Sequence, residues 1–212
     1  MTVAEVFPLK ECAKLLRLRG DAMQQAVPLN QGAMAAFIGA DIETTKKIIK
    51  EVESMGVCNI GNDNADGQVV ISGDKLTVDK AIELSKDFGV KRAVILPVSA
   101  PFHCQLMQPA QLIMEKALNE LNFNSPTVPI ICNINALPEK ETSKLKQNLI
   151  DQVTGTVRWR ETMNLANKLG VNKIIELGNG KVLTGIAKRM IDNVKAVNVE
   201  KPSDFDELLK II

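Results

Sequence analysis

The stretch VCNIGNDNADGQVVISG, residues 57–73, contains two strand-like runs joined by a turn. The run QVVISG is rich in β-branched residues, which favour strands, and the Ala-Asp-Gly segment before it is typical of a tight turn. This stretch therefore predicts a β-hairpin.

Working outward, each side of the hairpin adds one helix and one strand. On the N-terminal side, GAMAAFIG (32–39) predicts a strand and DIETTKKIIKEVESMG (41–56) a capped amphipathic helix. On the C-terminal side, KLTVDKAIELSKDFG (75–89) predicts a helix and RAVILPV (92–98) a strand. The resulting order, β-α-β-β-α-β, is that of a ferredoxin-like unit, which we place at residues 28–97. That fold hosts many functions, so it says little about this one.

The remainder of the chain alternates helices with strongly apolar strands. The predicted helices are 109–123, 143–153, 161–170 and 181–192, and the predicted strands are PTVPIICNI (126–134) and the buried NKIIELG (172–178). Solid apolar strands between helices are typical of a parallel sheet. The prediction is thus an α/β fold, with an incomplete parallel-sheet body at 1–27 and 98–212 and the ferredoxin-like subdomain set into it.

Composition excludes several classes of protein. The formal net charge is +1, aromatic residues make up 3% and tyrosine is absent, so we expect no nucleic-acid partner. No apolar run reaches the ~20 residues of a membrane span, and the start MTVAEVFPLKEC lacks the features of a signal peptide. The four cysteines are too scattered for a zinc or redox motif. We expect a cytoplasmic protein without a membrane partner, metal site or cofactor.

Arg19 has an unusual place in the helix predicted for residues 9–25. A spacing of 3.6 residues puts it on one stripe with Leu9, Cys12, Leu16 and Met23, while Arg17 faces water. A buried guanidinium keeps its charge and needs an anion. The anion is either an internal Asp or Glu or the carboxylate of a substrate, and the sequence leaves both open.

His103, in VSAPFHCQLM (98–107), is the only histidine in the chain. It is the one side chain whose ordinary pKa suits acid–base chemistry near neutral pH, although a lone histidine more often stabilises a loop. The adjacent Cys104 is a poor partner because neighbouring side chains diverge, and no Gly-x-Ser-x-Gly elbow occurs. A candidate base is present, and a convincing nucleophile is not.

Three further segments give weak signals. ELGNGKVLTG (176–185) lacks the third small residue of a dinucleotide loop and the Ser or Thr of a Walker loop, so we interpret it as a tight strand-to-helix turn, with Lys181 near an anion at most. Gln152, near a helix end, has the simplest interpretation of a solvated polar residue. Asn62 and Asn64 are most simply turn formers.

Six motifs in this order resemble the malonyl-CoA:acyl carrier protein transacylases of type II fatty acid synthesis, and the acyltransferase domains of polyketide synthases. They are LLRLRGDAMQQAVP, GAMAAFIG, NDNADGQVVISG, LPVSAPFHCQLMQPA, DQVTGTVRW and ELGNGKVLTGIAKR. The resemblance runs from about residue 6 to the C-terminus and implies an α/β-hydrolase-like body. One small departure is Asn179, where the family usually has proline.

The resemblance also implies roles for the candidate residues. His103 would be the general base for an acylated serine, and Gln152 would orient His103 through its main-chain or side-chain oxygen. Arg19 would pair with the free malonyl carboxylate, and Asn62 and Asn64 would lie near the substrate. The substrate would be malonyl-CoA, the acceptor the phosphopantetheine thiol of acyl carrier protein, and no cofactor would be needed.

The family's serine elbow, Gly-His-Ser-Leu-Gly, does not occur in these 212 residues. We therefore expect the isolated chain to be inactive unless an N-terminal fragment bearing the elbow completes it. An alternative is a non-catalytic module that binds the acidic carrier protein through Lys181, Lys188 and Arg189. A third possibility is an acyltransferase that uses another nucleophile, Cys104 or Ser99.

Overall fold

The computed structural model describes residues 1–211, and the chain forms two compact units, Met1–Arg158 and Trp159–Ile212. The boundaries predicted at residues 27/28 and 97/98 are different from this division and stay a prediction. No helix within the described residues is both long and apolar enough to cross a bilayer.

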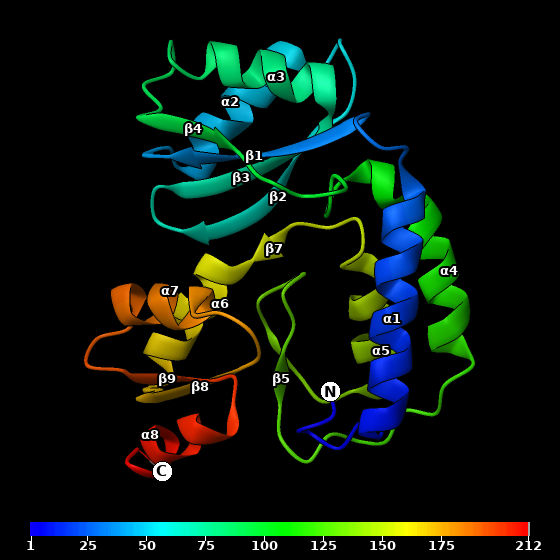
Figure 1. Cartoon of the computed structure of the whole chain (residues 1–212), viewed down its shortest axis with the longest axis vertical. Coiled ribbons are helices and arrows are strands. Elements are labelled where there is room, and N and C mark those ends of the chain that lie inside the picture. The colour runs from blue at the N-terminus through cyan, green and yellow to red at the C-terminus, as the bar shows by residue number, and fades with distance from the viewer. Residues whose placement is uncertain (212) are drawn as a thin grey trace. The chain divides into compact units, whose positions relative to one another are not determined.

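The first unit contains a mixed five-stranded sheet in the order β4-β1-β3-β2-β7 (Figure 1). The pairs β2–β3, β1–β3 and β1–β4 are antiparallel, and the pair β2–β7 is parallel. The first four strands, with helices α2 and α3 between them, follow the β-α-β-β-α-β order expected of a ferredoxin-like unit. The strands are β1 (Gly32–Ile38), β2 (Cys58–Ala65), β3 (Gln68–Asp74), β4 (Arg92–Ile95) and β7 (Val157–Arg158).

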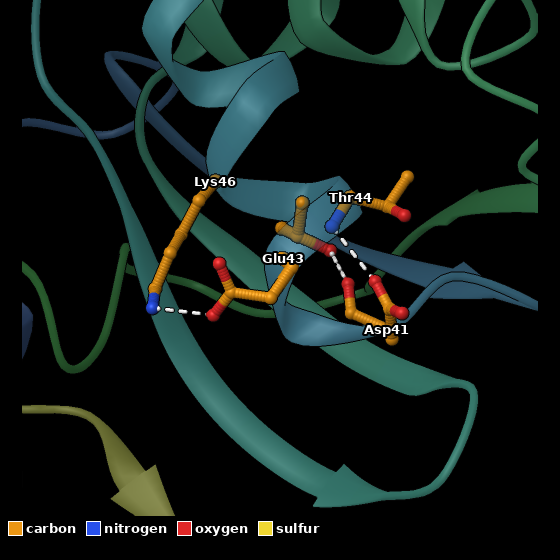
Figure 2. Close-up of polar contacts among 5 residues, drawn as sticks. Asp41, Glu43, Thr44 and Lys46 are labelled. Atoms are coloured by element: carbon orange, nitrogen blue, oxygen red, sulfur yellow. Dashed lines mark hydrogen bonds and ion pairs between the residues drawn. The ribbon is translucent and has the colours of Figure 1, made fainter.

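Helices α2 (Ile42–Val52) and α3 (Lys75–Leu84) pack against this sheet. Their apolar residues form one core with β1 and β3, in which Phe37 and Ile48 are fully buried. The Asp41 side chain caps α2 by accepting a hydrogen bond from the Thr44 amide at 2.7 Å (Figure 2). The capping predicted from the sequence is confirmed.

The hairpin turn is narrower than the sequence suggested. Gly67, at φ +72°, forms the turn together with Asp66. Asn62 and Asn64 lie inside β2, so their interpretation as turn formers is wrong. Bulges interrupt the β2–β3 register between Ile60 and Asn62 and between Asp63 and Ala65, so Asn64 lies in a bulge, whereas Asn62 pairs with Val70.

A helical layer forms the remainder of the first unit. Helix α1 (Leu9–Ala26) packs against α4 (Gln108–Asn119), and α4 packs against α5 (Thr142–Asp151). The stripe predicted on α1 is only partly correct: Met23 is buried, but Leu9 and Leu16 are 72% and 62% exposed. The helix buries its C-terminal part, Ala22 and Met23, because α4 and the segment before it contact that end.

Two predicted strands are different in the structure. Of residues 126–134, only β5 (Ile130–Ile131) is extended, paired antiparallel with β6 (Pro138–Glu139). Strand β8 (Lys173–Leu177) pairs in parallel with β9 (Lys195–Val199), yet Leu177 is 65% exposed, so the prediction of a buried strand is wrong. The runs of consecutive apolar residues correctly predicted that these segments contain strands, but the burial predicted for the second strand is wrong.

The second unit surrounds that two-stranded sheet with helices. They are α6 (Trp159–Lys168), α7 (Val182–Met190), the short 3-10 turn η2 (Pro202–Asp204) and α8 (Phe205–Leu209). The Glu176 carboxylate accepts hydrogen bonds from the amides of Leu183 and Thr184 and from the Thr184 hydroxyl. The first turn of α7 thus already has an internal anion, which supports the interpretation of this loop as a structural turn.

Candidate active site

His103 lies in the loop between β4 and the 3-10 turn η1 (Gln105–Met107). Its backbone has φ +59°, a left-handed conformation that costs a non-glycine residue about 1–3 kcal/mol and is found often at functional sites. The ring Nδ1 lies 2.9 Å from the main-chain oxygen of Gln152. This contact joins two of the residues that the sequence analysis singled out, His103 and Gln152.

The contact with Gln152 decides the proton position on the ring. A carbonyl oxygen can only accept a hydrogen bond, so Nδ1 must carry the proton and donate it. In the neutral ring, Nε2 then has a free lone pair and can accept a proton from another group. The His103 ring is thus oriented by a neutral oxygen, where many hydrolases use a carboxylate to orient their histidine.

Gln152 caps the C-terminus of α5 and is partly buried, so its interpretation as a solvated residue is wrong. Its side-chain Nε2 donates to the Gly155 oxygen at 2.7 Å, which closes the loop after the helix. Its side-chain oxygen is buried without a hydrogen-bond partner in residues 1–211. The main-chain oxygen, and not the side chain, is the group that orients His103.

Arg19 is partly buried and makes no ion pair with a carboxylate among the described residues, whereas Arg17 is exposed and pairs with Asp21 at 3.4 Å. Burial lowers the pKa of the Arg19 guanidinium from its ordinary value, but the group stays charged. The internal ion pair considered from the sequence is absent from the part of the chain described here. The other alternative, a ligand carboxylate, stays a prediction.

Two cavities lie beside these residues. One, of about 680 Å³, is lined by His103, Lys46 and the amide-bearing residues Asn59, Gln105, Gln108 and Gln111. The other, of about 200 Å³, is lined by Arg19 and Gln152 among mainly apolar residues such as Leu15 and Met114. The structure thus brings Gln152 together with both His103 and Arg19, while Asn62 and Asn64 line neither cavity.

Sequence reasoning missed the amides that line the larger cavity. Gln105, Gln108 and Gln111 recur every third residue after His103, a spacing that places them along one side of a helix. That repeat could have been used to predict that one side of the cavity is polar. Lys46, which also lines the cavity, pairs with Glu43 at 2.8 Å (Figure 2), so its charge is already balanced.

The structure speaks against Cys104 as a nucleophile. Its side chain is fully buried, and Sγ donates to the Pro101 oxygen at 3.0 Å. Burial raises the pKa of the thiol, which leaves little of the reactive thiolate. Ser99 is exposed, and the contact that the structure gives for it is from Gln24 to its main-chain oxygen.

Comparison with known proteins decides the family. A malonyl CoA-acyl carrier protein transacylase of Escherichia coli K12 is 37% identical over 211 residues, which are 100% of this chain and 68% of that protein. The chain belongs to the malonyl CoA-acyl carrier protein transacylase family. The protein of the same name from Haemophilus influenzae is 38% identical over 206 residues, 97% of this chain and 66% of its own length.

Solved structures agree with this family assignment. The acyl-carrier-protein-S-malonyltransferase of Bartonella henselae superimposes with a TM-score of 0.93 at 45% identity, covering 99% of this chain and 67% of that one. A malonyl-transacylase in complex with a type II polyketide synthase acyl-carrier protein gives the same TM-score at 36% identity, covering 99% and 68%. The chain thus spans about two thirds of the length of these relatives. No family model matches it.

The pKa of His103 gives a testable pH dependence of stability. Burial lowers this pKa, the hydrogen bond to Gln152 opposes the shift, and the positive charge of Arg19 adds to it. Between the lowered folded pKa of His103 and the unfolded value of about 6.5, the unfolded chain therefore binds more protons than the folded one. The free energy of unfolding should rise with pH up to about 6.5 and then level off.

Urea unfolding at a series of pH values between about 5.5 and 7.5 measures this effect, because the carboxylates titrate mainly at lower pH. Replacing His103 with glutamine should flatten the slope in this window. An unchanged slope in His103→Gln would show that another group is responsible.

Proposed function

We propose that this chain carries the His–Gln–Arg part of a malonyl-transfer site. In this proposal the malonyl group moves from malonyl-CoA to the phosphopantetheine thiol of acyl carrier protein, with no bound cofactor, in the cytoplasm. The observation that carries the proposal is the 2.9 Å contact that leaves Nε2 of His103 free to accept a proton. Family membership supplies the reaction class.

Each residue has a stated role in the proposed reaction. His103 takes the proton from a serine hydroxyl as the oxygen attacks the thioester carbon and CoA leaves as the thiol. It returns that proton to the leaving CoA thiolate. In the second step His103 takes the proton of the carrier thiol as its sulfur attacks the malonyl-serine ester, and it returns the proton to the serine oxygen as the ester bond breaks. Arg19 binds the free malonyl carboxylate through charge-assisted hydrogen bonds. Asn62 and Asn64 stay predicted substrate contacts.

The serine belongs to a Gly-His-Ser-Leu-Gly elbow, which these 212 residues do not contain. The proposal therefore requires an elbow-bearing polypeptide of the family. We expect the purified chain to gain no malonyl adduct by intact-mass spectrometry after incubation with malonyl-CoA. Co-expression with the elbow-bearing portion of the Escherichia coli relative should restore transfer to acyl carrier protein.

Replacing His103 with alanine in the co-expressed pair should lower the transfer rate by about 10²–10⁴-fold, the usual contribution of a general base. A stoichiometric adduct on the chain alone that disappears with His103→Ala would show that the nucleophile lies within these residues. Unchanged transfer in His103→Ala would contradict the proposed role of His103.

A second function, a non-catalytic module that binds acyl carrier protein, is favoured by the basic side chains at the two ends of α7. Lys188 and Arg189 lie in the last turn of α7, and Lys181 precedes its first turn. One solved relative is in complex with an acyl-carrier protein. Binding through these side chains should weaken steeply with salt, because exposed charges are screened. Carrier binding that is insensitive to salt would contradict it.

A further inference from the structure

Two loops that are far apart in the sequence are fastened to neighbouring residues of one strand. We propose that Asn59 is a positioning residue, which holds the His103 loop on β2 so that Nδ1 of His103 stays on the Gln152 oxygen. The effect on transfer rests on the function proposed above, whereas the effect on the ring does not.

The first attachment joins the His103 loop to β2. The side-chain oxygen of Asn59 accepts a hydrogen bond from the Gln105 amide at 3.1 Å, two residues after His103. Asn59 itself lies in the β2–β3 ladder, opposite Ser72, before the first bulge. It therefore belongs to a regularly paired part of the sheet and forms a fixed point for the loop.

The second attachment joins the Gln152 loop to the next residue of β2. The Thr156 hydroxyl donates to the Ile60 oxygen at 2.6 Å, and the Gln152 side chain donates to the Gly155 oxygen at 2.7 Å. The loop is thus closed on itself and anchored one residue from Asn59. Two adjacent residues of a single strand set the distance between His103 and Gln152, which are 49 positions apart.

An anchor is needed because His103 is strained. A left-handed φ in a non-glycine residue persists only where its surroundings hold it, and otherwise the loop relaxes to a lower-energy conformation. Once the Asn59 hydrogen bond is removed, the loop can relax and the 2.9 Å contact opens. Without the carbonyl acceptor, the neutral ring can carry its proton on either Nδ1 or Nε2.

The single histidine makes a direct test possible. In ¹⁵N-labelled protein at a pH where the ring is neutral, the two ring nitrogens of His103 report the tautomer without overlap from any other histidine. We expect the wild type to show one tautomer, with the proton on Nδ1. In Asn59→Ala the two nitrogen shifts should move toward each other, as in a mixture of tautomers.

Three variants complete the design. Asn59→Asp keeps an acceptor for the Gln105 amide and should retain the wild-type tautomer. Thr156→Val removes the other anchor and should resemble Asn59→Ala. Asn135→Ala is the matched control, because the Asn135 side-chain oxygen accepts from the Leu137 amide at the same 3.1 Å within its own turn. The control should leave the His103 signals unchanged.

A folded Asn59→Ala protein with the wild-type tautomer would overturn the proposal. If Asn59→Ala does not fold, Asn59→Leu, which keeps the size of the side chain and lacks the acceptor, decides: a mixed tautomer supports the proposal, and an unchanged one overturns it. In the co-expressed pair, Asn59→Ala should lower kcat by about tenfold with little change in KM, as expected for a misoriented base. Absence of transfer in the wild-type pair would instead contradict the proposed function, and the nitrogen signals would still test the role of Asn59.

Discussion

Replacing Arg19 with alanine is expected to remove the preference of the site for malonyl-CoA over acetyl-CoA. Acetyl-CoA lacks the free carboxylate, so the proposed Arg19 contact should appear as a difference in binding free energy between the two thioesters. A charge-assisted hydrogen bond contributes about 1.5–3 kcal/mol, which corresponds to about a 10- to 150-fold change in Kd. Calorimetric titration of the co-expressed pair with each thioester gives both constants.

Arg17 provides the control for this experiment, since it lies on the same helix but is exposed and paired with Asp21. Arg17→Ala should leave both dissociation constants unchanged. Arg19→Lys should restore only part of the preference, because an ammonium group cannot bind a carboxylate in the bidentate geometry of a guanidinium. Equal loss of affinity for both thioesters in Arg19→Ala would mean that Arg19 supports the fold and does not select the acyl group.

The second large effect is expected from Gly73→Ala in β3. A Cβ at this position would lie 1.9 Å from the main-chain oxygen of Val57. The backbone there cannot move away easily, because Val57 and Asp74 are joined by two hydrogen bonds, of 2.8 and 2.6 Å. We expect the free energy of unfolding to fall by about 3 kcal/mol, at the upper end of overpacking effects.

Urea unfolding curves measure this loss, with Gly20→Ala as the matched control. Gly20 lies inside α1, and a Cβ there would meet nothing within 4 Å. The same chemical change should therefore stabilise the protein by about 0.5–1 kcal/mol, because alanine loses less conformational freedom in a helix. A small effect at Gly73 would show that the start of β2 can shift.

The sequence was sufficient to predict the ferredoxin-like unit because local signals there agree with long-range pairing. The Asp-Gly turn, the capped helix after Asp41 and the β-branched run of β3 each predict the same topology. Burial was harder to predict. Leu16 and Leu177 have the periodicity of core residues but are exposed in the structure, since periodicity indicates a face and not what covers it.

The candidate site was only partly predictable for a different reason. His103 was visible as the one residue with a suitable ordinary pKa, and Arg19 was visible as a charge on an apolar stripe. Asn59 could not be found from the sequence, because its proposed role depends on a contact with a backbone amide 46 positions away. The motif around Asn62 and Asn64 predicted that these two residues contact the substrate, whereas the asparagine that lines the larger cavity is Asn59.

The oxygen that orients His103 belongs to the peptide backbone, and this has a consequence for mutational scanning. No substitution at position 152 deletes that atom, so alanine at this position removes only the side-chain bond to Gly155. A scan of single substitutions would therefore report only how the side chain at position 152 stabilises the loop, and it would not detect the contribution of the main-chain oxygen to orienting His103. Only replacement of the peptide bond by an ester, which weakens the carbonyl as an acceptor, would expose its contribution.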